Sequence, residues 1–140
     1  MSNQEVPTPR EFLDAVENRF GRITWDLAAT RENSVAGSAY CWTLEDDALS
    51  EECSWNCTRS WLNPPFASIR PWVKKASETP RGYGPLVLLP AAVCTDWFNT
   101  YVRKYAKVYE LFPRVFKTEI RDTILCDYQD LPGRELWVWK

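Results

Sequence analysis

The spacing of apolar residues along the chain predicts helices that alternate with short strands. A helix is expected over residues 9–20, with Thr8 as its N-cap and four apolar side chains on one face. A strand follows over residues 22–26 and ends on Asp26. Residues 30–58 show no sustained period, so we expect loops there, with short helical or strand pieces.

The second half of the chain has clearer periodic signals. A strand at residues 59–62 runs into two prolines, and the next helix is expected from Ser68, its cap, to about Ser77. The continuous apolar run at residues 85–90 is typical of a strand buried on both faces. The remaining expected elements are a helix capped by Thr95, a strand at 108–112, and strands at 122–128 and 135–139 that form a C-terminal β-hairpin.

This order of elements indicates an α/β fold with a mostly parallel sheet. A chain of 140 residues has the usual length of one domain, so we expect a single domain over residues 1–140. No apolar run approaches the roughly 18 residues of a membrane span, and the N-terminus lacks the pattern of a signal peptide. The expected location is therefore cytoplasmic, without a membrane partner.

Composition limits the chemistry that is possible. The chain contains no histidine, which excludes Ser-His-Asp and Cys-His catalysis and histidine-based zinc sites. The five cysteines are scattered, and only Cys53 and Cys57 lie close together, so we expect free thiols and no metal site.

Charge is distributed unevenly along the chain. Residues 1–60 hold 5 basic and 11 acidic side chains, whereas residues 61–140 hold 12 basic and 8 acidic ones. The basic half either forms solvated helix faces or supplies a surface for phosphates. The basic residues of this half that are candidates for such phosphate contacts are Arg70, Lys74, Lys75, Arg81, Arg103, Lys104 and Lys107.

One short motif, Asn63-Pro64-Pro65-Phe66, carries candidate chemistry. It follows a predicted strand, and ligands of mostly parallel sheets bind beyond the carboxyl ends of the strands. The prolines fix the backbone, so the Asn63 side-chain oxygen and the Pro64 carbonyl can accept both hydrogens of one planar amine. Such contacts free the nitrogen lone pair for attack on a methyl group. Taken alone, the motif is equally compatible with a rigid turn between strand and helix.

Several other segments, taken with this motif, indicate a family resemblance. Together and in this order, they resemble the phage-type DNA N6-adenine methyltransferases, the Dam-like family, from Thr8 to Lys140. The resemblance implies a compact Rossmann-like fold that uses S-adenosylmethionine. The segments that carry it are Thr8-Pro9, Phe20-Gly21, residues 25–30, Asn33, residues 45–49, residues 61–66, Trp72-Val73, residues 88–91 and Trp97-Phe98.

The resemblance also assigns roles to individual residues. Asn63 and the Pro64 carbonyl receive the target amine, Pro65 completes the catalytic motif, and Phe66 stacks on an adenine flipped out of the DNA duplex. The residues expected to bind S-adenosylmethionine are Thr8, Pro9, Asp26, Ala28 and Asp47, of which Asp47 is equally compatible with a solvated acidic loop.

The sequence therefore predicts methyl transfer from S-adenosylmethionine to the N6 amine of adenine in DNA. Two alternatives stay open: the same transfer onto protein glutamine or RNA, and a non-catalytic DNA-binding relative. The glycine-rich turn common after the first strand of methyltransferases is absent here, and Ala28 and Ala29 stand in its place.

Overall fold

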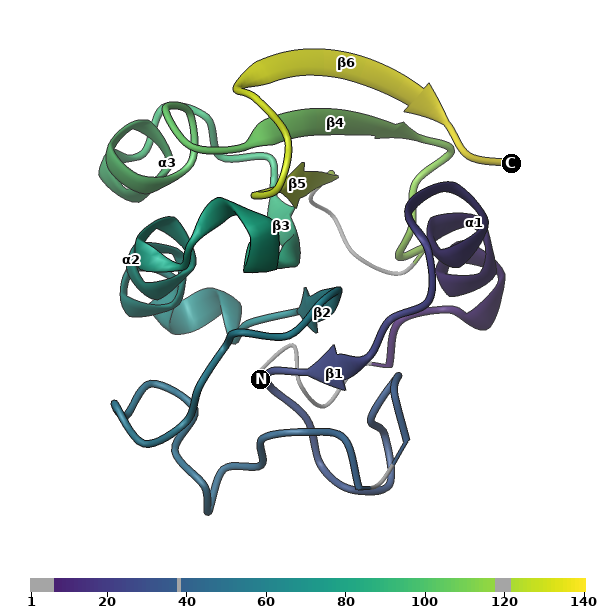
Figure 1. Cartoon of the computed structure of the whole chain (residues 1–140). Helices are drawn as coiled ribbons and strands as arrows, with labels where there is room; N and C mark the ends of the chain where they lie inside the picture. Colours follow the sequence, from purple (N-terminus) through teal and green to yellow (C-terminus); the bar gives the residue numbers. More distant parts are fainter. Residues whose placement is uncertain (1–6, 38, 118–121) are drawn as a thin grey trace.

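The structure is a computed structural model that describes residues 7–37, 39–117 and 122–140. A six-stranded sheet runs through it, with helix α1 on one face and helices α2 and α3 on the other (Figure 1). The elements are α1 (Arg10–Phe20), β1 (Trp25–Asp26), β2 (Ser60–Leu62), the 3-10 turn η2 (Phe66–Ser68), α2 (Arg70–Glu78), the 3-10 turn η3 (Arg81–Tyr83), β3 (Leu86–Pro90), α3 (Asp96–Tyr101), β4 (Lys107–Phe112), β5 (Thr123–Asp127) and β6 (Gly133–Val138).

The strands lie in the order β1-β2-β3-β5-β4-β6. β1, β2 and β3 pair in parallel, β4 pairs in parallel with β6, and β5 opposes both of its neighbours. Five strands therefore point the same way and only β5 is reversed, which confirms the mostly parallel sheet. We call the side where these five strands end the carboxyl edge, and the side where they begin the amino edge.

The predicted C-terminal β-hairpin is wrong. β6 pairs with β4 and not with β5, because β5 already has β3 on one side and β4 on the other. All five residues of β5 are buried, whereas the residues of β6 are exposed or half-buried, with the exposed ones more numerous. The buried residues of β5 are thus compatible with an inner strand of the sheet, and the exposed residues of β6 with an edge strand.

Helix ends agree only in part with the sequence pattern. Thr95 caps α3 as predicted, since its hydroxyl accepts a hydrogen bond from Phe98 N. The caps predicted at Thr8 and Ser68 are wrong: α1 follows Pro9 and α2 follows Ile69, and neither has a side-chain cap. Local sequence permitted these caps, but the backbone begins each helix one residue later. In the part of the chain that the structure describes, none of the helices is long and apolar enough to cross a bilayer.

Two apolar clusters cover the two faces of the sheet. On the α1 face, Trp61 of β2 and Leu125 of β5 pack with Phe12. On the face of α2 and α3, Leu62 packs with Trp72 and other buried residues. β3 is buried along its whole length, as its apolar run predicted. Neighbouring residues of a strand therefore contribute to opposite clusters. The cluster that one residue joins thus shows on which face the next residue at the strand end lies.

Candidate active site

Asp26 and Asn63 lie at the carboxyl edge, as the sequence predicted. Asp26 is the last residue of β1, and Asn63 directly follows β2. Since the two strands pair in parallel, with Asp26 opposite Trp61, their ends are neighbours. Pro64 and Pro65 then lead into η2 at Phe66, so the motif forms a short connection from strand to helix.

The Asn63 side chain is buried without a hydrogen bond. Only 7% of the residue is exposed, and Oδ1 has no partner among the described residues. An unpaired buried acceptor of this kind costs about 1–3 kcal/mol, so natural proteins retain few of them and mainly where they have a use. The other unpaired buried side-chain atoms in the described ranges are Trp25 Nε1, Ser60 Oγ and Thr123 Oγ1.

Pro64 and Phe66 differ in their surroundings. Pro64 is buried, whereas Phe66 is half-buried and packs against the apolar cluster on the α2 and α3 face. A ring that keeps one part exposed is available for stacking on a planar ligand. The stacking role expected for Phe66 stays a prediction.

Asp26 orders the loop that follows β1. Its carboxylate accepts hydrogen bonds from Ala28 N at 3.2 Å and from Val35 N at 3.0 Å. The residue is only 4% exposed. Burial raises the pKa of Asp26 from 3.8 to about 6, although both hydrogen bonds favour the charged form. The carboxylate thus holds the backbone around Ala28, a predicted cofactor residue, in place.

The raised pKa of Asp26 predicts a pH dependence of stability. Because the folded state binds the proton more tightly than the unfolded state, the contribution of this group is fully present below its ordinary pKa of 3.8 and is lost as pH rises through about 6. We expect the difference in free energy of unfolding between the wild type and Asp26→Asn to change across this window and to level off above it. Chemical denaturation at a series of pH values measures this difference, and a constant difference would contradict the assignment.

A small cavity joins three of the predicted residues. Its volume is about 100 Å³. Ala28 from the loop after β1, Asp47 from the acidic segment and Pro65 from the motif all line it, together with Trp42 and Trp72. No local pattern in the sequence marks the two tryptophans as part of this site, although they supply its aromatic walls. Asp47 adopts a left-handed backbone with φ of 54°, a conformation that only a tight loop imposes on a non-glycine residue.

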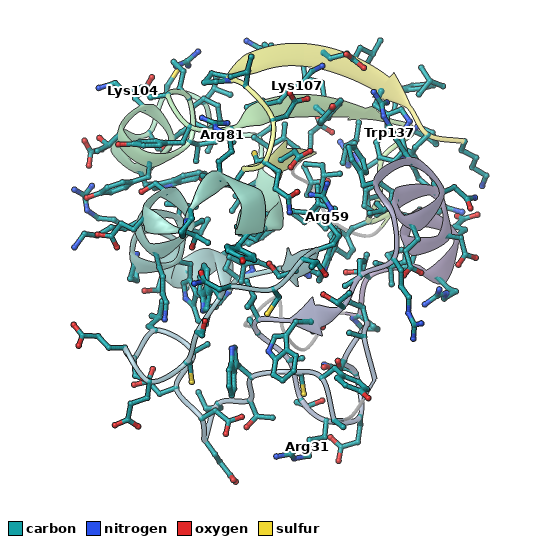
Figure 2. The ribbon with its side chains drawn as sticks, in the orientation of Figure 1. Arg31, Arg59, Arg81, Lys104, Lys107 and Trp137 are labelled. Carbon is teal, nitrogen blue, oxygen red and sulfur yellow. The ribbon has the colours of Figure 1, made fainter. Side chains whose placement is uncertain are left out.

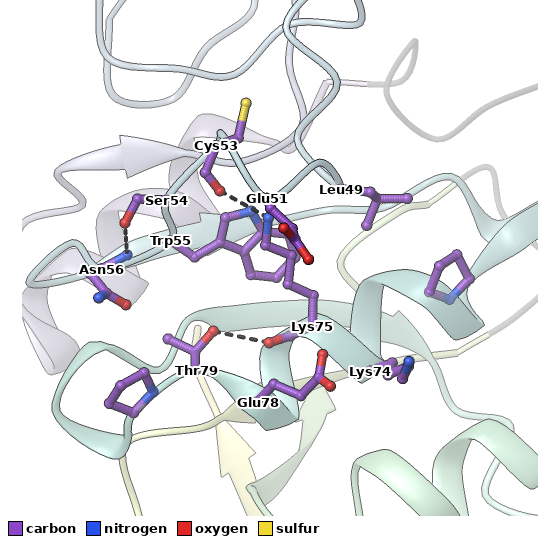
Figure 3. Close-up of a pocket in the computed structure, with 12 residues that line it drawn as sticks. Leu49, Glu51, Cys53, Ser54, Trp55, Asn56, Lys74, Lys75, Glu78 and Thr79 are labelled. Atoms are coloured by element: carbon purple, nitrogen blue, oxygen red, sulfur yellow. Dashed lines mark hydrogen bonds between the residues drawn. The ribbon is translucent and has the colours of Figure 1, made fainter.

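Lys75 of α2 fixes the loop that carries Asp47. Its Nζ donates to the carbonyl oxygens of Ala48, Ser50 and Cys53 at 2.7–2.8 Å. Figure 3 shows the side chain reaching from α2 to this loop beside the Trp55 ring. Burial lowers the pKa of Lys75, but its three protons are all bonded. The prediction that Lys75 contacts DNA phosphates is therefore wrong.

A larger cavity of about 620 Å³ lies on the other side of this loop. Lys74, Glu78 and Trp55 line it, and none of the residues predicted to bind the cofactor or the target amine does so (Figure 3). The smaller cavity, which does join predicted residues, is the better candidate for a part of the site.

Thr8 and Pro9 stand at the amino end of α1. The first turn of this helix packs on β2, since the Phe12 ring lies 6.4 Å from the Trp61 ring between centroids. Trp61 is two residues from Asn63, so this turn lies near the carboxyl edge. In the described ranges, Thr8 forms no side-chain hydrogen bond, and its place at a ligand stays a prediction.

Comparison with known proteins gives consistent results. The family model described as DNA N-6-adenine-methyltransferase (Dam) matches residues 3–113, a range that contains every predicted site residue. The DNA N-6-adenine-methyltransferase of Escherichia phage T1 is 34% identical over 102 residues, which are 72% of this chain and 42% of that protein. The chain thus spans less than half the length of this curated relative. These matches confirm the resemblance seen in the sequence: the chain belongs to the Dam family of DNA N-6-adenine-methyltransferases.

Proposed function

We propose that this chain transfers a methyl group from S-adenosylmethionine to the N6 amine of adenine in DNA. The observation that carries the proposal is the unpaired, buried Asn63 Oδ1 at the end of β2. Membership of the Dam family and the name of the phage T1 relative, DNA N-6-adenine-methyltransferase, support the same activity.

In this proposal, the chain acts by positioning and by electrostatics. Asn63 Oδ1 accepts one N–H of the amine and the Pro64 carbonyl accepts the other, which draws the nitrogen toward tetrahedral geometry. Phe66 stacks on the flipped base and keeps it in the plane that this contact requires. S-adenosylmethionine would supply the methyl group and leave as S-adenosylhomocysteine, and the methylated amine would lose one proton to solvent.

The residues present fit this cofactor. Ala28 is small enough for a ligand to approach the backbone, and Trp42 and Trp72 offer apolar surfaces for a ring. Asp47 adds a carboxylate that can accept hydrogen bonds from ribose hydroxyls or an amine. Thr8, Pro9 and the loop ordered by Asp26 complete the proposed cofactor site.

We also propose that the fold is Rossmann-like and that residues 1–140 form one domain. The parallel strands β1, β2 and β3 end together at the edge where the candidate site lies. Both apolar clusters pack on one sheet, which supports a single domain. A DNA substrate is also consistent with the cytoplasmic location expected from the sequence.

The cations available for DNA differ from the predicted set. Lys107 begins β4 and Arg81 precedes β3, so both lie at the amino edge, about 16 Å of strand length from the carboxyl edge. Figure 2 shows Arg31, in the loop after β1, far from both of them. We infer that phosphates around a flipped base meet cations of the carboxyl edge, among them Lys117 in the loop after β4 and Arg70 at the start of α2, whose exposed guanidinium also pairs with Asp96.

A labelling experiment tests the proposed function. The protein is incubated with duplex DNA and S-adenosylmethionine labelled in the methyl group, and the DNA is digested to nucleosides. Labelled N6-methyldeoxyadenosine is the expected product, and DNA binding should weaken with salt by about 0.9 log units per log unit for each neutralised phosphate. Parallel incubations supply RNA or protein in place of DNA, and label found only in these would favour the first alternative. Binding to DNA without any transfer would favour a non-catalytic relative.

A further inference from the structure

Thr123 stands at the carboxyl edge although it opens a strand. It is the first residue of β5, the one reversed strand, and it pairs with Pro90, the last residue of β3. A residue at the beginning of β5 therefore lies at the edge where Asn63 and Asp26 are found. The sequence offered no sign of this, because only the reversal of β5 brings Thr123 there.

Thr123 also shares a sheet face with Asn63 and Asp26. Side chains alternate along a strand, so Thr123 is on the face of Leu125, and Asn63 is on the face of Trp61. Both Leu125 and Trp61 belong to the cluster on the α1 face. Asp26 lies between two residues that pack on the opposite face, Trp25 and Leu27. The three polar residues Asp26, Asn63 and Thr123, here called the polar row, thus lie on one face along the carboxyl edge.

The hydroxyl of Thr123 is buried and unpaired. The residue is 5% exposed, and Oγ1 has no hydrogen-bond partner among the described residues. From strand spacing and register, its Cα lies on the order of 12 Å from that of Asn63, so the two side chains cannot satisfy one another. A ligand that meets both must extend across the end of β3.

Position along the polar row separates two ligands. Asp26, which orders the loop proposed to hold the cofactor, lies at the β1 end of the row, and Asn63 receives the amine in the middle. Thr123 stands at the opposite end, directly after Asp122, to which Arg114 of the preceding loop is paired at 3.0 Å. Lys117 in the same loop is exposed. A base whose amine is at Asn63 and whose donor is on the β1 side must extend toward β5 and its cations.

We propose that the Thr123 hydroxyl hydrogen-bonds the target nucleotide of the DNA and is a further substrate-binding residue of this enzyme. The proposal rests on the proposed function. It accounts for an unpaired hydroxyl at the edge of the site, where a ligand group completes its hydrogen bonding.

The test compares Thr123→Val with a matched control, Ser60→Ala. Ser60 Oγ is also buried and unpaired, but Ser60 begins β2 and lies at the amino edge. We expect Thr123→Val to raise the KM for DNA roughly 3- to 10-fold and to leave the Kd of S-adenosylmethionine unchanged, since one neutral hydrogen bond is lost. Ser60→Ala should change neither constant. Both variants should melt at or above the temperature of the wild type, because each removes an unsatisfied polar group.

Two results would overturn the proposal while the wild type methylates DNA. An unchanged KM for DNA and an unchanged cofactor Kd in Thr123→Val would show that the hydroxyl binds neither ligand. An unchanged KM for DNA with weaker binding of S-adenosylmethionine would show that the hydroxyl contacts the cofactor instead. If Thr123→Val does not fold, Thr123→Ser and Thr123→Ala repeat the comparison, with serine expected to retain the wild-type KM. A wild type that transfers no methyl group to DNA would instead reject the proposed function itself.

Discussion

Asn63→Ala should lower the rate of methyl transfer by roughly 100-fold or more. The proposed contact exists only with the target amine, so the Kd of S-adenosylmethionine should stay close to that of the wild type. The substitution also removes an unpaired buried acceptor, and the free energy of unfolding should therefore not fall by the amount usual for a buried residue. Turnover with saturating cofactor, isothermal titration and chemical denaturation measure the three quantities.

An exposed asparagine provides the control for this experiment. Asn56→Ala alters a surface loop away from the carboxyl edge and should leave turnover unchanged. Near-normal turnover of Asn63→Ala on DNA would reject the catalytic assignment. Equal loss in both variants would show that the assay reports damage to the loop region rather than loss of an amine contact.

Lys75→Met should have the second large effect. Methionine preserves much of the stem but removes the charged donor shared by the carbonyl oxygens of Ala48, Ser50 and Cys53. Trp55 Nε1 and Cys53 N still donate to the first two, so Cys53 O is left unpaired among the described residues. We expect the free energy of unfolding to fall by about 2–4 kcal/mol, because bonds from a charged donor are strong and several are lost at once. Asp47 and Ala48 line the proposed cofactor cavity, so the Kd of S-adenosylmethionine should rise about tenfold or more.

The neighbouring lysine is a matched control. Lys74 is exposed and its ammonium group forms no hydrogen bond or ion pair with the described residues, so Lys74→Met should change stability by less than about 0.5 kcal/mol. Lys75→Arg keeps the charge but cannot place three donors at one point. Its free energy of unfolding should therefore lie between those of the wild type and Lys75→Met. If Lys75→Met were as stable as Lys74→Met, the three bonds would not hold the loop.

Much of the fold could be predicted because the signals are local. The buried run that became β3, the prolines that end β2 and the cap at Thr95 each act within a few residues. The same holds for the positions of Asp26 and Asn63 at strand ends. Their roles came from the family resemblance, and the structure adds the unpaired oxygen of Asn63 and the bonds of Asp26 to its own loop.

The hairpin and the DNA-binding cations could not be predicted in this way. Two strands separated by a short turn usually pair. Here β5 already has a neighbouring strand on each side, so the chain crosses β4 after β5 and β6 pairs with the far side of β4. Lys75 and Lys107 are both basic residues close to predicted strands, and sequence alone does not show that one binds three carbonyls and that the other begins a strand at the amino edge.

The sequence by itself determined the alternation of helices and strands, the family and the motif from Asn63 to Phe66, because these depend on residue type and on short-range spacing. Only the tertiary structure decided which segments meet. The reversal of β5 brought Thr123 to the edge that holds Asn63, and Lys75 bound the acidic loop beside Ala28 and Pro65. Such contacts join residues far apart in the chain and depend on sheet order and on the pairing of buried polar groups, which no local pattern encodes.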